Sequence, residues 1–394
     1  MRGRDTLFKT SLATYIGFLS AFSYVNYFPG EKVEALKNGV KDSVMEKVEF
    51  VKSFYDFPFF LVPDSLSVDA PVKPDSLETR VESSLPDFDA VHRIFESTRV
   101  PVLMFHEFGE REDRYTVSPR NFERILYDLY VNDFYSVSLD EFVSGDFSSV
   151  PVGKKPVLLT FDDAPESQFR INNDGSVCSR SAVGVMESFY DEYDFGRGGV
   201  FFVSYGSYNK FRLPFAQNDF VSDKLKFLID NGYDVAYHTV FHNNNTGASM
   251  NNIFEQNVVS SALFHKFLGE EYFDKVSSSF AHPFGASPSN GVVFDYLASS
   301  YESVFDAWGG ASKHPLSSGF DVKRITRIEI THQTLNSLVL GLRNTYRVTP
   351  ETEKFYDFVN TRLRDDPEKI EPLKPLYVDK LVNGAKLSEP IIFF

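Results

Sequence analysis

The chain has almost no cysteine. Its 394 residues include one thiol, Cys178. A single thiol excludes an intrachain disulfide, and it excludes any zinc or iron–sulfur site built from several cysteines. A secreted protein of this kind needs a large hydrophobic core in place of disulfide cross-links.

Positive charge is also scarce. The chain has 40 Lys and Arg against 55 Asp and Glu, which gives a formal net charge of −15. This balance argues against nucleic-acid binding, because phosphate contacts need Lys and Arg. Apolar residues, in contrast, are plentiful: they make up 42% of the chain, with 41 Phe and 20 Tyr. That content is enough for a sizeable core and excludes a disordered chain.

Residues 1–30 look like an export signal. Arg2, Arg4 and Lys9 precede an uncharged run over residues 10–29, and about 20 such residues can just span a bilayer as a helix. Positive charge on the N-terminal side predicts that the rest of the chain lies outside the cytoplasm. A membrane anchor, a cleaved signal peptide and a buried helix of a soluble protein all remain open.

The chain then divides into three further parts. Residues 31–98 are predicted to form a stalk or linker, because they combine one amphipathic stretch with many prolines among Ser and Asp. Residues 99–344 carry the signals of a folded α/β domain. Residues 345–394 are charged and contain proline, so we expect a C-terminal extension of peripheral helices and irregular chain.

Within residues 99–344, short apolar runs alternate with helix-like stretches. Strands are predicted at 100–106, 134–138, 156–161, 199–205, 233–237, 278–282, 302–306 and 322–330. Helices are predicted at 118–132, 180–192, 221–231, 251–268, 290–300 and 332–343. This alternation predicts a parallel sheet with crossover helices, and about seven such units would close into a (β/α) barrel more readily than form an open sheet.

The strongest local signal is a buried strand, Val157–Phe161, that ends in Asp162 and Asp163. In an α/β barrel, function is located at the carboxyl ends of the strands. Two adjacent carboxylates do not share a dry pocket unless a cation joins them. One of them is then free to bind a metal while the other faces a bound water. An Asx turn after the strand is the structural alternative.

A second strand end carries His238 and His242, four residues apart. On one helical turn the two imidazoles would share a face, which suits chelation of a metal ion. Imidazole and carboxylate together suit zinc or a similar divalent ion. A chance pair on a solvated turn is the alternative.

A third strand end reads Ala281-His282-Pro283-Phe284-Gly285. Proline and glycine at these positions allow close backbone approach, so a main-chain N–H can point at a substrate oxyanion. An ordinary exit from a strand is at least as good an explanation of this segment alone. The three strand ends together predict a site with two His and one carboxylate as ligands and a spare carboxylate as general base. Such a site is hydrolytic.

These motifs, in this order, resemble the polysaccharide deacetylase (NodB-like, carbohydrate esterase) family. The similarity covers about residues 99–335 and depends most on Thr160–Asp163 and His238–His242. The resemblance implies a distorted, incomplete (β/α) barrel that hydrolyses N- or O-linked acetyl groups of a carbohydrate. It further implies the roles of five residues: Asp162 as general base, Asp163, His238 and His242 as ligands of a divalent metal such as zinc, and the Phe284 amide as oxyanion donor.

Two features depart from the family pattern. Ala281 stands where the family often has an arginine that orients the base, and Arg327 lies in an Arg-Ile pair of unassigned role. No segment clearly matches the family's late Leu-x-His element, which supplies the general acid. The candidates for that acid are His332, His314, His282 and His106.

Two other functions are therefore kept open. One is a catalytically silent carbohydrate-binding or cell-surface module on the same fold, suggested by the substituted arginine and the missing acid. The other is a metal-dependent amidohydrolase or esterase that acts on a small molecule, which would have a deep closed pocket instead of an open groove. The oligomeric state and the glycan have no signature in the sequence.

Overall fold

The computed structural model describes residues 85–207, 210–331, 342 and 344–360. These residues belong to one compact unit, Leu85–Phe393. The predicted signal or anchor segment, the stalk up to residue 84, nearly all of the predicted helix 332–343 and the tail beyond residue 360 lie outside the described residues. Within the described part of the chain, no helix is long and apolar enough to cross a membrane.

The centre of the fold is an eight-stranded sheet in which every pair of neighbours is parallel. Seven strands follow one another in the order β12 (Ser303–Phe305), β11 (Ser279–Ala281), β10 (Asp234–Tyr237), β7 (Val200–Val203), β6 (Lys155–Asp162), β2 (Val102–Phe105) and β14 (Ile328–Glu329). The eighth strand, β5 (Phe134–Ser136), pairs with β6. The predicted parallel α/β sheet is confirmed, and each strand falls inside or next to its predicted range.

One extended segment connects the two edges of this sheet. Ile325 exchanges backbone hydrogen bonds with Val304 and Asp306 at the β12 edge. Five residues further on, the Ile330 amide donates to the Met104 carbonyl of β2 at 3.0 Å. The segment 322–330 was predicted as one strand, but only Ile328–Glu329 pairs regularly. This segment therefore runs from β12 to β2 and closes the curled sheet. Because most of the segment does not pair as a regular strand, the barrel is distorted.

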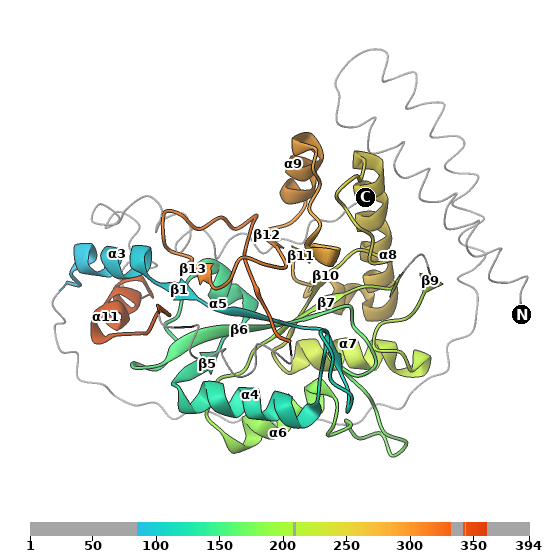
Figure 1. Cartoon of the computed structure of the whole chain (residues 1–394), viewed down its shortest axis with the longest axis horizontal. Coiled ribbons are helices and arrows are strands. Elements are labelled where there is room, and N and C mark those ends of the chain that lie inside the picture. The colour runs from blue at the N-terminus through green and yellow to red at the C-terminus, as the bar shows by residue number, and fades with distance from the viewer. Residues whose placement is uncertain (1–84, 208–209, 332–341, 343, 361–394) are drawn as a thin grey trace, which may run out of the picture. The chain divides into compact units, whose positions relative to one another are not determined.

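Helices follow the strands as the alternation predicts (Figure 1). They are α4 (Pro119–Val131), α5 (Leu139–Ser144), α6 (Ala182–Glu192), α7 (Val221–Asp230), α8 (Met250–Phe273) and α9 (Gly291–Ser299). Helix α4 shows why: Ser118 caps it, Pro119 occupies its first turn, and its buried residues Phe122, Ile125, Leu126 and Leu129 lie on one face. In Figure 1, α4 and α6 lie together on one side of the sheet.

The sheet is buried on both faces, so its strands are nearly continuous apolar runs. Seven of the eight residues of β6 are buried. Phenylalanine fills much of the space: the Phe161 ring stacks between Phe105, at 5.4 Å between centroids, and Phe201, at 4.7 Å. The abundance of Phe in the sequence thus supplies the core on which the site rests.

Two further helices pack against each other beside the barrel (Figure 1). Helix α3 (Phe88–Ser97) lies in the segment predicted as a stalk, and α11 (Pro350–Phe358) lies in the predicted C-terminal extension. Phe95 of α3 is fully buried and meets the Phe355 ring of α11 at 5.5 Å. Both segments therefore contribute to the hydrophobic core. A sequence pattern does not show this, because each helix needs a partner about 260 residues away.

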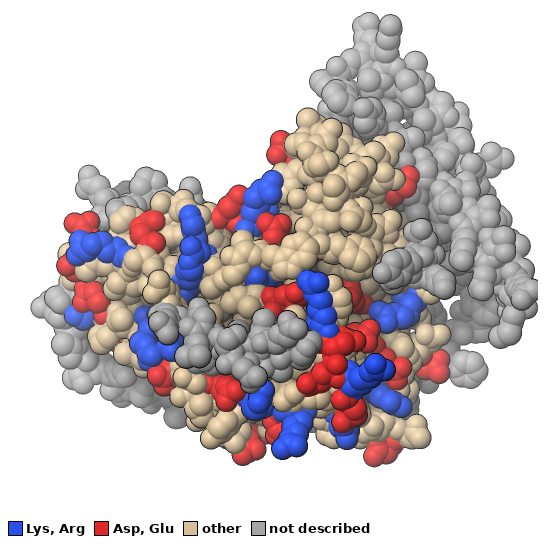
Figure 2. Space-filling view, viewed as in Figure 1, with Lys and Arg blue, Asp and Glu red and all other residues tan. Residues whose placement is uncertain are grey.

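Three short strand pairs lie outside the main sheet. β1 (Arg99–Val100) pairs with β13 (Ser312–Lys313), β3 (Glu107–Phe108) with β4 (Thr116–Val117), and β8 (Gly206–Ser207) with β9 (Lys210–Phe211). A 3₁₀ turn, η2 (Pro283–Gly285), follows β11, and another, η1 (Asn218–Phe220), precedes α7. On the face in Figure 2, acidic and basic side chains are interspersed, and the surface over α9 carries few charges.

Candidate metal centre

Asp163, His238 and His242 come together at the carboxyl ends of β6 and β10. One ligand atom from each side chain lies within 4.8 Å of the other two. Asp163 Oδ1 is 3.2 Å from His238 Nε2 and 3.1 Å from His242 Nε2. Asp163 and His242, the outermost of the three predicted ligands, are 79 residues apart in the sequence. The three side chains nonetheless form a compact set of one oxygen and two nitrogen donors.

The backbone turns sharply to bring both aspartates to this site. Successive side chains of a strand point to opposite faces, so an extended Asp163 would point away from Asp162. Instead Asp163 has φ 75° and Ala164 has φ 49°. Two consecutive left-handed residues are costly without glycine. This turn brings both carboxylates to the side of the sheet where the two histidines lie.

The two histidines converge by a different route from the one predicted. We expected one helical turn, but the residues between them are not helical. Thr239 has φ 59° and His242 has φ 53°. The helical-turn geometry is therefore wrong, whereas the convergence of the two rings is right. The ring centroids are 5.1 Å apart.

The orientation of His238 carries the strongest evidence for a metal. Its Nδ1 lies 2.8 Å from the Ala281 carbonyl oxygen. A carbonyl only accepts hydrogen bonds, so Nδ1 is the nitrogen that donates, and in the neutral ring Nε2 presents a lone pair. That Nε2 faces Asp163 Oδ1, and neither atom forms a hydrogen bond with a described residue although both are buried. A cation between them would satisfy both atoms, so the residues fit a divalent metal.

The electrostatics of the site favour a positive charge. Burial lowers the pKa of His238, but the carboxylates of Asp162 and Asp163 more than offset this and leave it raised. Burial and the neighbouring His238 lower the pKa of His242 to about 4. Burial opposes ionisation of Asp163, yet His238 and His242 hold its pKa well below the usual range. Asp163 is therefore ionised and His242 neutral, the states in which these two side chains bind a metal.

Asp162 lies beside this set in a different environment. It is 2% exposed, and the fully buried Arg327 binds it with two hydrogen bonds of 2.6 and 2.8 Å. Burial raises the pKa of Asp162, but Arg327 and His238 outweigh it, so the pKa is lowered. Asp162 Oδ2 is 3.9 Å from His238 Nε2. An ionised, firmly oriented carboxylate therefore stands next to the three ligands without belonging to their closest set.

Arg327 holds Asp162 from a distant part of the chain. Both of its Nη atoms contact the Asp162 carboxylate, and its Nε donates to the Asp306 carbonyl at 2.8 Å. The position of Ala281, where the family resembled by the motifs often has an arginine, carries no cation. Ala281 keeps a main-chain role, because its carbonyl holds the His238 ring. The sequence marked Arg327 but did not indicate its partner.

Aromatic side chains lie beside the ligands. Phe284 has φ 57° and is 44% exposed, and its ring lies 4.2 Å from that of His242. Gly285, with φ 61°, leaves no room for a side chain, because an added Cβ would lie 2.6 Å from the Ala307 Cβ and 2.9 Å from the Trp308 ring. Trp308 is itself 54% exposed. Sequence analysis did not single out Trp308, since exposure on a loop has no periodic signature.

The structure describes three of the four candidates for the general acid and excludes one of them. His314 is fully buried in the core, stacks on Phe95 at 4.3 Å and accepts the Leu316 amide at Nδ1, so it is excluded. His106 follows β2, and a positive charge on it would lower the pKa of Asp163. His282 follows β11 and is 1% exposed, and neither ring nitrogen bonds to a described residue. His332 lies outside the described residues.

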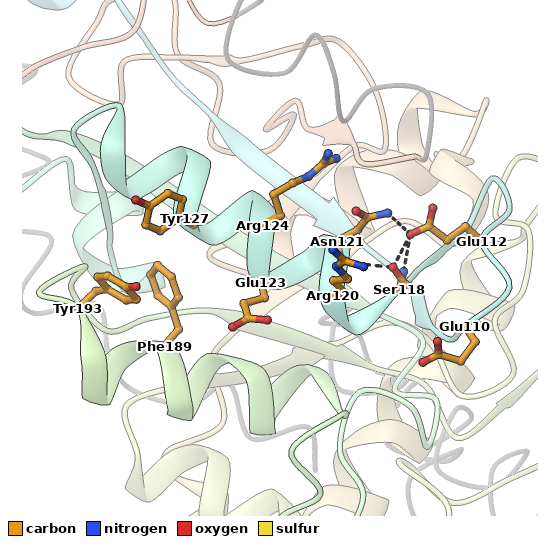
Figure 3. A pocket seen from close by; sticks show the side chains of 10 residues that line it. All are labelled: Glu110, Glu112, Ser118, Arg120, Asn121, Glu123, Arg124, Tyr127, Phe189 and Tyr193. Atoms are coloured by element: carbon orange, nitrogen blue, oxygen red, sulfur yellow. Dashed lines mark hydrogen bonds between the residues drawn. The ribbon is translucent and has the colours of Figure 1, made fainter.

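A separate groove of about 770 Å³ lies away from these residues (Figure 3). It is lined by side chains of α4 and α6 and of the loop before α4, including Tyr127, Tyr193 and Glu112. The Glu112 carboxylate accepts hydrogen bonds from the Ser118 amide and hydroxyl, and from Asn121. Its acceptors are thus used to hold the start of α4, and none of the ligand residues lines this groove.

No protein-family model matches the chain, and no curated protein matches it either. Solved structures similar to it include a polysaccharide deacetylase from Bacillus cereus, at 21% identity and a TM-score of 0.46, covering 62% of this chain and 69% of that one. A Streptococcus pyogenes deacetylase in complex with acetate is 18% identical at a TM-score of 0.47, covering 63% and 99%. IcaB from Ammonifex degensii is 19% identical at a TM-score of 0.45, covering 63% and 98%. The family resembled by the motifs is also that of the Bacillus cereus structure.

Proposed function

We propose that this chain is a metal-dependent hydrolase that removes acetyl groups, N- or O-linked, from a carbohydrate. One observation carries the proposal. The Ala281 carbonyl fixes the ring of His238 so that Nε2 faces Asp163 Oδ1, with both atoms buried and without hydrogen bonds to described residues. Together with His242 Nε2, 3.1 Å from the same oxygen, these atoms form a ligand set of the kind that binds catalytic zinc.

Each residue of the site has a distinct task in this reaction. Asp163, His238 and His242 would hold the divalent metal, which when bound lowers the pKa of water and polarises the acetyl carbonyl. Asp162 takes the proton from the attacking water, and Arg327 keeps this carboxylate ionised and aimed. The Phe284 amide stabilises the oxyanion. His106 or His282 donates the proton to the leaving group.

The class of substrate rests on the resemblance of the motifs and on the surroundings of the site. The exposed Phe284 ring lies 4.2 Å from the ring of His242, and Trp308 is exposed beside Gly285. Aromatic side chains commonly line the sites that bind organic ligands. Zinc suits two imidazoles and one carboxylate. The charged and apolar pattern of residues 1–30 supports a location outside the cytoplasm, anchored or secreted, where such glycans are found.

Two observations disfavour a silent carbohydrate-binding module on the same fold. All three ligands converge, and Asp162 is held by Arg327 with two short hydrogen bonds. A buried ion pair of this kind is an expensive arrangement unless its carboxylate is used. A binding module that only stacks sugars on aromatic rings would not need it.

Acetate release tests the proposal directly. We expect the protein to release acetate from at least one member of a panel of acetylated glycans, to lose this activity with a chelator, and to regain it with Zn²⁺ or another divalent ion. A set of small acetylated esters and amides serves as the comparison panel. Binding of glycans without acetate release would favour the silent module, and turnover of the small compounds alone would favour the small-molecule hydrolase.

A further inference from the structure

The peptide carbonyl of Asp163 accepts two hydrogen bonds from outside its own strand. The Ser204 hydroxyl donates to it at 3.1 Å, and Arg212 Nη2 donates at 3.0 Å. Arg212 also approaches the next carbonyl, that of Ala164, at 3.5 Å. The Phe215 amide donates to the same Ala164 carbonyl at 2.7 Å. Both carbonyls of the left-handed turn are therefore held by donors from residues 204–215.

This turn determines where the Asp163 carboxylate points. In an extended strand the side chain of Asp163 would lie on the face opposite to Asp162. With φ 75° at Asp163 and φ 49° at Ala164 it lies with the histidines instead. Left-handed residues other than glycine cost of the order of 1–3 kcal/mol and persist only where their surroundings hold them. The hydrogen-bond donors to the Asp163 and Ala164 carbonyls hold the turn in this conformation.

Arg212 is positioned to donate hydrogen bonds to the carbonyls of this turn. Its backbone amide donates to the Tyr205 carbonyl at 2.8 Å, which places it next to Ser204 at the end of β7. Its side chain is half-buried, and among the described residues it forms no ion pair with a carboxylate. The guanidinium is thus directed at main-chain oxygens of the turn and does not contact the metal ligands' side chains.

We propose that Arg212, together with Ser204, is a positioning residue that holds Asp163 in its left-handed conformation and so sets the metal affinity of the site. The inference rests on the proposed function, because it needs Asp163 to be a metal ligand. Arg212 acts through the backbone of that ligand, because its hydrogen bonds go to main-chain oxygens. Residues that orient metal ligands from outside the coordination set typically change metal affinity about 10- to 100-fold when they are removed.

The experiment is a zinc titration of full-length Arg212→Met, Arg212→Lys and wild type by competition with a chromogenic chelator, with thermal unfolding of the same samples. Arg212→Met removes all donors but keeps an apolar side chain of similar reach, and we expect it to weaken zinc binding at least about tenfold. Arg212→Lys retains one donor and should recover most of the affinity. Arg197→Met is the control, because Arg197 also donates to a backbone carbonyl, that of Asn231, but is exposed, pairs with Glu187 and lies away from the site.

A second variant separates positioning from general stability. Ser204→Ala removes the other donor to the Asp163 carbonyl, and since either donor can satisfy that oxygen, the double variant should lose more affinity than the two single losses combined. Equal zinc affinity in wild type and Arg212→Met, with only a lower unfolding temperature for the variant, overturns the inference. Failure of the wild type to bind any divalent metal would instead overturn the proposed function.

Discussion

Two carboxylates lie at opposite ends of the sheet, on strands β6 and β10, which β7 separates. They show how the environment of a carboxylate distinguishes a functional role from a structural one. Asp162 ends β6 at the site, and Arg327 with His238 lowers its pKa against the effect of burial. Asp234 begins β10 at the opposite end of the sheet, where burial raises its pKa to about 6. Its hydrogen bonds come from neutral donors, the Ser277 hydroxyl at 2.7 Å and the Leu139 amide at 3.1 Å.

The difference teaches that burial alone would raise the pKa of the proposed base. A dry carboxylate without a cation takes up a proton near neutral pH, whereas a guanidinium with two hydrogen bonds keeps it ionised. The carboxyl end of the sheet therefore maintains a charge ready for proton transfer, and the amino end does not. Changes at the first end should affect chemistry most, and changes at the second should affect only stability.

The largest effect is expected at the ligand. Asp163→Ala removes the only carboxylate among the three ligands, so we expect loss of stoichiometric zinc and loss of acetate release to background. The unfolding free energy measured in chelator should stay within about 1 kcal/mol of wild type, because no buried partner is left without a hydrogen bond that it had before. Elemental analysis of the purified proteins checks this. Zinc content equal to that of wild type would show that Asp163 is not a ligand.

Asp162→Asn should keep the metal and lose turnover. The amide cannot take a proton from water, and removal of a general base typically lowers the rate about 10²- to 10⁴-fold. Zinc affinity is expected to change less than tenfold, because the three proposed ligands remain. Acetate release at saturating zinc, measured beside the zinc titration, separates the two quantities. A variant with unchanged turnover would remove Asp162 from the reaction.

Arg327→Met should make the environment of Asp162 resemble that of Asp234. Without the guanidinium the Asp162 pKa should rise, so the acidic limb of the pH–rate profile moves to higher pH. Loss of one partner of a buried ion pair typically costs about 3–5 kcal/mol. The Arg327→Met/Asp162→Asn double variant should regain part of this stability, because it no longer buries an unpaired charge. An unshifted acidic limb in an active Arg327→Met variant would contradict this role of Arg327.

Asp234→Asn should give the smallest effect, and one confined to stability. The folded-state pKa of about 6 lies above the ordinary aspartate pKa of 3.8, so the folded protein binds more protons than the unfolded chain between these values. The unfolding free energy of wild type therefore falls as the pH rises from about 4 to about 6, by at most about 3 kcal/mol from this group. Asp234→Asn should flatten that part of the profile and leave acetate release unchanged. Denaturant unfolding at a series of pH values tests it.

Sequence reasoning predicted much of this fold for a simple reason. A strand buried on both faces is a continuous apolar run in the sequence. A helix such as α4 is indicated by a cap residue, a proline in the first turn and a regular apolar face. The same reasoning missed that α3 and α11 belong to the core, because their apolar faces are completed by each other and by distant residues such as His314 and Tyr346. It also failed for the residues between His238 and His242, because a left-handed loop has no sequence period.

The sequence by itself determined which chemical groups stand at the ends of the strands: the paired aspartates, the two histidines and the Pro-Phe-Gly turn. Only the tertiary structure decided how they work together. Arg327 meets Asp162 across 165 residues of sequence, and Arg212 meets Asp163 across 49. Such contacts have no local pattern, because they arise only when a parallel sheet curls and brings the carboxyl ends of distant strands to one edge.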